Sequence, residues 1–223
     1  MADFTIYLGN RNYSSWSLRG WLMVRQAGIS CREEVIPLFE RGYQEKVRRY
    51  SPSGRVPVLH HGSARIWDSL AIGEYLHELH PEAGLWPEGR NARRLARSVS
   101  AEMHAGFPAL RQALPMNIRR SAPGAVAIDP EVREDINRIT AIWRDSRHWI
   151  EENAADGDEG FLFGKQSIAD AMYAPVATRF ITYGIEVDAD CRAWMDRMMA
   201  LPAMREWVRD AGDEPQILEI YEV

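Results

Sequence analysis

The chain has 223 residues, of which 46% are hydrophobic and 26% are charged, a composition typical of globular proteins. Its formal net charge of −5 argues against a nucleic-acid-binding protein, because such proteins normally present a basic surface. No apolar run approaches the ~20 residues that a membrane-spanning helix needs, so we expect no membrane association. At ~150 residues per domain, the length fits one large domain or two small ones.

The cysteines and histidines exclude several kinds of site. Cys31 and Cys191 lie far apart and in no CxxC spacing, so we expect neither a disulfide scaffold nor a cysteine-based zinc site. His77 and His80 lack the His-Glu-x-x-His spacing of a zinc protease, so we predict no metal. The N-terminus lacks the basic start and apolar stretch of a secretory signal, which favours a cytoplasmic location with reduced thiols.

The first 80 residues alternate between strand and helix patterns. β-branched and apolar runs broken by Gly or Pro predict strands at residues 4–8, 31–38, 58–60 and 64–67. Capping residues followed by helical spacing predict helices at residues 15–27, 41–50 and 69–79. The order β-α-β-α-β-β-α predicts a small mixed sheet covered by helices.

Proline and glycine dominate residues 81–88, which indicates a linker. Beyond it only helical patterns occur, at residues 92–114 with Pro108 as an expected interruption, 132–150, 167–183, 193–201 and 202–211. The helix that begins after Ser167 opens with a capping-box pattern and is apolar all round, which is typical of the buried centre of a helical domain. We therefore predict an α/β domain at residues 1–80 and an all-α domain at residues 89–223.

Four segments, in this order along the chain, resemble the cytosolic glutathione transferases: Tyr13-Ser14-Ser15-Trp16-Ser17-Leu18-Arg19, residues 51–59 (SPSGRVPVL), residues 68–72 (DSLAI) and residues 167–170 (SIAD). The resemblance covers essentially the whole chain. It implies a thioredoxin-like first domain that binds glutathione and an all-helical second domain that shapes the pocket for an electrophile. It also implies glutathione as co-substrate, no metal, and assembly into a homodimer.

The serine-rich segment is closest to the zeta class of that family, whose pattern is Ser-Ser-Cys-Ser-x-Arg. Trp16 stands where that class has its cysteine. Because that cysteine helps to define the isomerase activity of the class on maleylacetoacetate-type substrates, we expect this chain to lack that activity. Residues 100–111 and 115–117 also resemble a group of bacterial glutathione transferases.

A hydroxyl at the start of the first helix suits the activation of a thiol. A free thiol with a pKa near ~8.5 is mostly protonated at pH 7, and a hydrogen bond together with a helix N-terminus stabilises the thiolate. Lowering that pKa by ~2 units needs about 2.7 kcal/mol. By resemblance to the zeta pattern we favour Ser14 as the catalytic residue, with Ser15 as the alternative. Simple N-capping of the helix also explains a serine cluster at this position.

Other residues are assigned to glutathione by the resemblance. It implies that the Val56–Pro57 bond is cis and that the main chain before Pro57 pairs with the cysteinyl moiety of glutathione like an added strand. The turn at Asp68 and Ser69 could hold the γ-glutamyl group, with Ser69 on the carboxylate and Asp68 on the amino group, although both also suit a helix cap. The nearby candidates for the glycyl carboxylate are Arg41, Gln44 and Arg55.

The second substrate is assigned to the helical domain. Met103, Phe107, Arg111 and Met116 are candidates for its pocket, because an adaptable apolar wall suits varied electrophiles. Helical core explains Met103 and Phe107 equally well. Three functions stay open: a glutathione transferase that uses the thiolate to attack an electrophile, a zeta-like cis-trans isomerase, and a non-catalytic glutathione-binding protein.

Overall fold

The computed structural model describes residues 4–153 and 157–222. Its strands are β1 (Phe4–Leu8), β2 (Cys31–Val35), β3 (Val58–His61) and β4 (Ala64–Trp67). Its α-helices are α1 (Ser15–Gln26), α2 (Tyr43–Tyr50), α3 (Ser69–Leu79), α4 (Arg90–Ala105), α5 (Pro108–Ala113), α6 (Pro130–Glu152), α7 (Ile168–Tyr183), α8 (Ala189–Ala200) and α9 (Pro202–Asp213). Short 3₁₀ helices occur at Pro81–Ala83 and Glu219–Tyr221.

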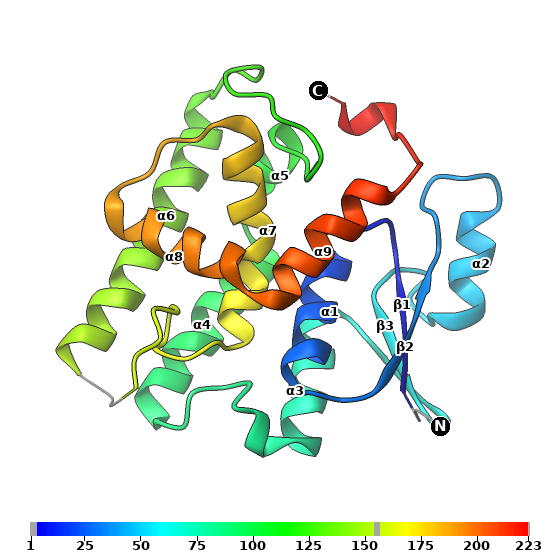
Figure 1. Ribbon diagram of the computed structural model, residues 1–223, viewed down its shortest axis with the longest axis horizontal. Coiled ribbons are helices and arrows are strands. Elements are labelled where there is room, and N and C mark those ends of the chain that lie inside the picture. Colours follow the sequence, from blue (N-terminus) through cyan, green and yellow to red (C-terminus); the bar gives the residue numbers. More distant parts are fainter. Residues whose placement is uncertain (1–3, 154–156, 223) are drawn as a thin grey trace.

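The sheet has the order β2-β1-β3-β4, with β1 parallel to β2 and the other neighbours antiparallel. Alternate residues of β1 face opposite sides, as a strand requires. Ile6 and Leu8 join the large core that includes α1 and α3, whereas Tyr7 packs with Val47 of α2. Figure 1 shows α1 and α3 on one side of the sheet and α2 on the other. The predicted mixed sheet with covering helices is confirmed.

Helices alone make up the second half of the described chain, apart from isolated bridges at residues 161–165. The predicted interruption is confirmed, because α4 ends at Ala105 and α5 begins at Pro108. As predicted, α7 lies at the buried centre of these helices. At its start the Asp170 carboxylate accepts hydrogen bonds from the main chain of Ser167 and Leu162, both at 2.9 Å. The architecture is an α/β sheet unit followed by helices, as expected.

Several predicted boundaries differ from the observed ones, and three of these differences have a clear local reason. The second strand ends at Val35 rather than residue 38, because Pro37 has no N–H for the ladder. The second helix begins at Tyr43 rather than residue 41, after Gly42 in the left-handed region at φ 81°. Helix α8 begins at Ala189 rather than 193, because the Asp188 carboxylate caps it by accepting from the N–H of Cys191 at 2.9 Å.

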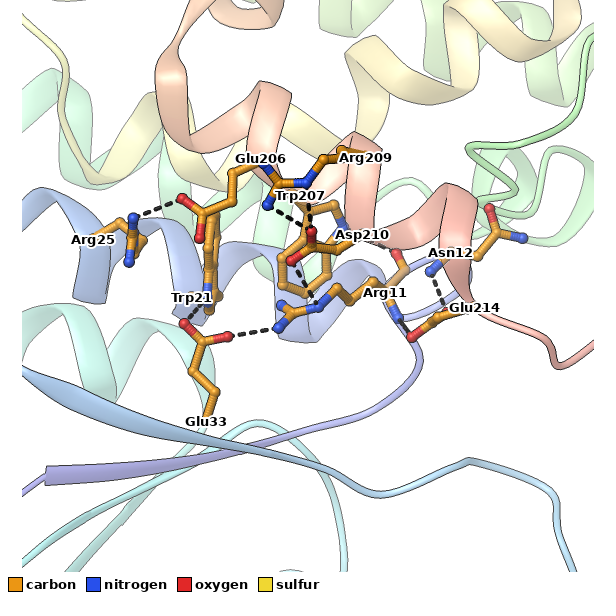
Figure 2. Close-up of polar contacts among 10 residues, drawn as sticks. All are labelled: Arg11, Asn12, Trp21, Arg25, Glu33, Glu206, Trp207, Arg209, Asp210 and Glu214. Atoms are coloured by element: carbon orange, nitrogen blue, oxygen red, sulfur yellow. Dashed lines mark hydrogen bonds and ion pairs between the residues drawn. The ribbon is translucent and has the colours of Figure 1, made fainter.

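A clasp of polar and aromatic residues fixes α9 against the sheet unit, and Figure 2 shows its members. The guanidinium of Arg11 donates to Glu33 at 2.6 Å and lies over the rings of Trp21 and Trp207. The carboxylate of Glu214 accepts from the main-chain N–H of Arg11 at 2.6 Å. This clasp joins the end of the helical half to the segment that leads into α1.

One continuous buried cluster extends from Ile6 of β1 to Trp207 of α9. Leu85 and Trp86, in the predicted linker, belong to it, and Leu85 accepts a hydrogen bond from the N–H of Ile168 at 2.9 Å. The division into domains at residues 81–88 therefore stays a prediction. Within the described ranges, no helix is long and apolar enough to cross a membrane.

Candidate functional site

A cavity of about 410 Å³ lies where the start of α1, the loop after β2, helix α2 and the segment before β3 meet. Its lining residues are Ser14, Trp16, Leu38, Phe39, Tyr43, Gln44, Val47, Arg48, Ser53, Gly54, Arg55 and Val56. It brings together four residues that the sequence assigns to one site, namely Ser14, Gln44, Arg55 and Val56. Arg41 is exposed and does not line this cavity.

Ser14 is the N-cap of α1 and is 6% exposed. Its Oγ accepts from the N–H of Ser17 at 3.3 Å and donates to the hydroxyl oxygen of Ser17 at 2.8 Å. The Ser17 oxygen also accepts from the N–H of Gly9 at 2.8 Å. The N-capping interpretation is thus confirmed, and the Ser14 hydroxyl stands at the positive end of a helix dipole on the cavity wall. Ser15 is the first residue of α1, is buried, and is not among the lining residues.

The segment before β3 presents main-chain groups to the cavity. The Val56–Pro57 bond is cis, as the resemblance implies. No described residue forms a hydrogen bond with the main chain of Val56, since the ladder of β3 begins at Val58. Pro57 packs on α1 at Gly20, where an added Cβ would lie 2.9 Å from Cγ of the proline. Val56 is therefore held at the cavity with its N–H and C=O free to pair.

Asp68 and Ser69 lie at the N-terminus of α3, outside the set of lining residues. Asp68 has φ 77°, an uncommon conformation for a residue other than glycine, and its Oδ1 accepts from the N–H of Leu70 at 2.9 Å. Its Oδ2 lies 2.6 Å from Nε2 of His104 on α4. Ser69 is buried, and its hydroxyl points to the sulfur of Met172 at 3.9 Å. The helix-cap interpretation of Asp68 is confirmed.

The four residues assigned to the electrophile pocket fall into two groups. Met103, Phe107 and Met116 are buried in the main hydrophobic core and do not line the cavity. Arg111 is half-buried, and its guanidinium donates to the carbonyl oxygens of Gly106 and Met103. Only Arg111 therefore has a polar group near the cavity wall, through its contact with Trp16.

Trp16 is surrounded by cationic and titratable groups. The guanidinium carbons of Arg19 and Arg111 lie 4.5 and 5.1 Å from the centre of its rings, and the ring of His104 lies 5.1 Å away, edge-on. Burial lowers the pKa of both arginines, and for Arg19 the neighbouring guanidinium of Arg111 lowers it further. This is the position at which the zeta pattern has a cysteine.

Sequence reasoning missed several lining residues. Arg48 follows Gln44 by four residues on α2 and donates to its side-chain oxygen at 3.2 Å, so helical spacing could have paired them. Phe39 and Tyr43 carry no such signal, because the loop after β2 has no regular pattern. His104 reaches Asp68 from another helix, which no local spacing reveals.

The two thiols lie outside the cavity. Burial raises the pKa of Cys31, in β2, to about 11 and that of Cys191, in α8, to about 12. Both are therefore poor nucleophiles near neutral pH. In the part of the chain that the structure describes, no cluster of three or more His, Cys, Asp or Glu side chains could hold a metal ion.

Comparison with known proteins relates this geometry to one family. Residues 13–79 match the family model described as glutathione S-transferase, N-terminal domain, and residues 130–210 match the C-terminal domain of the same family. The glutathione S-transferase-like protein tpcF of Aspergillus fumigatus is 31% identical over 175 residues, 72% of this chain and 76% of that protein.

Two further comparisons support the same fold. The maleylacetoacetate isomerase of Dictyostelium discoideum is 37% identical over 92 residues, which cover 40% of this chain and 41% of that protein. A crystal structure of a glutathione transferase homolog from Burkholderia with bound glutathione superposes with a TM-score of 0.67 at 21% identity, over 95% of this chain and 98% of that one.

Proposed function

The chain belongs to the glutathione S-transferase family, and from that premise we propose that it binds glutathione in the cavity at Ser14 and activates the thiol for attack on a small electrophile. The observation that carries the proposal is the position of the Ser14 hydroxyl, at the N-terminus of α1 and on the wall of a cavity beside unpaired main-chain groups of Val56. The cavity volume of about 410 Å³ suits a small-molecule ligand.

The lining of the cavity complements the parts of glutathione. The free N–H and C=O of Val56 can pair with the cysteinyl residue as an added strand does. Arg55, Arg48 and Gln44 offer donors to the glycyl carboxylate. The γ-glutamyl group then extends toward α3, where Ser69 stands at the helix N-terminus and Asp68 presents a carboxylate to the ammonium.

The hydrogen bonds of Ser14 make the activation energetically feasible. To donate to the sulfur, its hydroxyl must leave the Ser17 oxygen, which keeps the N–H of Gly9 as a donor. A neutral hydrogen bond contributes about 0.5–1.5 kcal/mol, whereas one to a charged group contributes about 1.5–3 kcal/mol. The helix N-terminus adds about 0.3–1 kcal/mol for a negative charge. A hydrogen bond from Ser14 to a thiolate is thus favoured over its hydrogen bond to Ser17.

The test is conjugation of glutathione to 1-chloro-2,4-dinitrobenzene across a pH range. If Ser14 lowers the thiol pKa by ~2 units, from ~8.5, Ser14→Ala reduces turnover roughly 50-fold at pH 6.5 and only slightly above pH 9, where the thiol ionises unaided. Ser15→Ala is the matched control, since Ser15 does not line the cavity. Turnover that is unchanged in Ser14→Ala, or lost equally at every pH, contradicts the proposed role.

A second candidate function is glutathione-dependent cis-trans isomerisation, favoured by the 37% identity to a maleylacetoacetate isomerase over 92 residues. In that reaction the thiolate adds to a double bond, the bond rotates and the thiolate leaves. Trp16, in place of the cysteine of the zeta pattern, argues against it. An assay with a maleylacetoacetate-type dienoate separates the two functions, and we expect conjugation without isomerisation.

The assembly and the division of the chain are also proposals. We propose a homodimer in the cytoplasm, with an α/β unit at residues 1–80 and a helical unit at residues 89–223; the resemblance to the family supports the dimer. Light scattering at micromolar concentration should give twice the chain mass of 25.5 kDa. A monomer at that concentration contradicts the proposed dimer.

A further inference from the structure

Arg19 is a buried cation with incomplete partners. Its side chain is fully buried in α1, and its Nε donates to the carbonyl oxygen of Met172 at 2.9 Å. Its two terminal nitrogens are inaccessible to solvent, and no described residue accepts from them. Burying a charge without hydrogen-bond partners is strongly unfavourable, so such a group points to a negative ligand.

The surroundings of Arg19 are positive rather than neutralising. Arg111 and the fully buried Arg179 both act on it as like charges, and burial lowers the pKa of Arg179 to about 9. Asp68 acts on it favourably, yet both Asp68 oxygens are already bound, to Leu70 and His104. Asp135 acts favourably on Arg111, and its Oδ2 accepts from the N–H of Leu110 at 2.9 Å. The three arginines of the cluster therefore outnumber these two carboxylates.

Trp16 joins this cluster to the cavity. Its ring lines the cavity together with Ser14, and the guanidinium groups of Arg19 and Arg111 lie against the same ring. Trp16, Arg111 and His104 are each half-buried, so Arg111 can be reached from solvent beside the ring, with Arg19 buried behind it. A group bound there lies next to the serine that is proposed to activate the thiol.

We propose that Arg111 and Arg19, whose guanidinium groups both lie against the Trp16 ring, form a subsite for a carboxylate carried by the second substrate, which makes the preferred electrophile an anion. This inference rests on the proposed function, because the electrophile must meet glutathione at Ser14. The alternative source of the same chemistry is a carboxylate of glutathione itself, and the experiment separates the two.

The probes are three thioethers that each contain the whole of glutathione. One is S-benzylglutathione, which is uncharged on its benzyl ring, and the others are the meta and para isomers of S-(carboxybenzyl)glutathione. Calorimetry measures their dissociation constants for the wild-type protein and for Arg111→Gln. Since a hydrogen bond to a charged group contributes about 1.5–3 kcal/mol, we expect the better carboxylated isomer to bind roughly 10-fold or more tightly than S-benzylglutathione. We expect Arg111→Gln to abolish that difference, so that the ratio of the two dissociation constants falls close to one.

Arg192→Gln is the matched control, because it removes one positive charge from an exposed position on α8. It should leave the ratio of the two dissociation constants unchanged. Arg111→Lys keeps the charge and should restore part of the preference. Arg19→Met extends the test to the buried cation and should also reduce the preference. Arg111 donates to two carbonyl oxygens, so measurable binding of S-benzylglutathione also shows that its variant is folded.

The outcomes are distinct. Equal affinity of wild-type protein for the charged and uncharged probes overturns the subsite and leaves the proposed function intact. If Arg111→Gln weakens the binding of both probes equally, Arg111 binds a carboxylate of glutathione itself, and the proposal is overturned. Failure of the wild type to bind either probe or glutathione overturns the proposed function, and the subsite with it.

Discussion

Nε2 of His104 lies 2.6 Å from Oδ2 of Asp68, and this contact joins α4 of the helical half to the N-terminus of α3. The other oxygen of Asp68 accepts from the N–H of Leu70 at 2.9 Å. Both oxygens are therefore engaged before any ligand arrives. In the proposed glutathione complex, a ligand ammonium at this carboxylate would share Oδ2 with the imidazole of His104.

Replacing Asp68 by Asn separates its charge from its capping role. Asn caps a helix as well as Asp does, so we expect little change in melting temperature. The loss of the carboxylate charge toward the ligand ammonium should weaken glutathione binding about 10-fold, measured by calorimetry. Asp129→Asn is the control, since Asp129 caps α6 in the same way through Val132, outside the cavity. Equal affinities for the two variants would show that Asp68 is only a cap.

Ser17 supports the start of α1 through a bond that Ala cannot make. In Ser17→Ala the buried N–H of Gly9 loses its acceptor, so the free energy of unfolding should fall by about 1–3 kcal/mol in urea titrations. Ser14 loses its competing acceptor at the same time, so conjugation by the folded protein should be retained. Ser98→Ala, at an exposed position on α4, is the control and should change the free energy of unfolding by less than about 0.5 kcal/mol. A Ser17→Ala protein that is stable but inactive would move the catalytic role from Ser14 to Ser17.

The clasp at α9 should depend on Glu33. Its carboxylate accepts from the indole of Trp21 at 2.7 Å and from Arg11 at 2.6 Å, and an amide cannot accept from both as well. We expect Glu33→Gln to lower the free energy of unfolding by about 1–3 kcal/mol. Glu34→Gln, on the same strand, removes only an exposed pair with Arg32 and should lower it by at most about 1 kcal/mol. Equal effects would show that the clasp adds no stability.

The raised thiol pKa values give a pH-dependent prediction. With its pKa near 11, Cys31 is only about 0.1% thiolate at pH 8, against roughly a quarter for a free thiol near ~8.5. Iodoacetamide should therefore label the native protein about 100-fold more slowly than the unfolded protein, at a rate that rises with pH. The folded state holds the thiol protonated, so its stability should fall as pH rises above ~8.5 toward 11. Cys31→Ser should conjugate normally; its inactivity would implicate the thiol in the reaction.

The residue pattern predicted local structure well, because that structure depends on neighbours in sequence. The strand at residues 4–8 and the serine cap of the first helix are properties of single segments, and both were found where predicted. The capping of α8 by Asp188 is also local, but the apolar spacing on which the prediction was based begins only at residue 193.

The site was less predictable where it depends on packing. Trp16 meets His104 of α4 and Arg111 of α5 only because side chains from segments far apart in the sequence come together in the fold, which no sequence spacing encodes. Met103 and Phe107 have the apolar spacing of a helix, and that spacing is the same for a pocket wall and for core. The structure places both in the core.

The clasp also contains two tryptophans whose spectroscopic signal depends on its structure. The rings of Trp21 on α1 and Trp207 on α9 lie 5.1 Å apart at 54°, with Arg11 beside both. Two indoles held this closely in a fixed chiral arrangement contribute to near-ultraviolet circular dichroism and shield each other from water-soluble quenchers. Detachment of α9 from the sheet unit can thus be followed without any added label, and compared with the loss of helix to show whether the two halves of the chain unfold together.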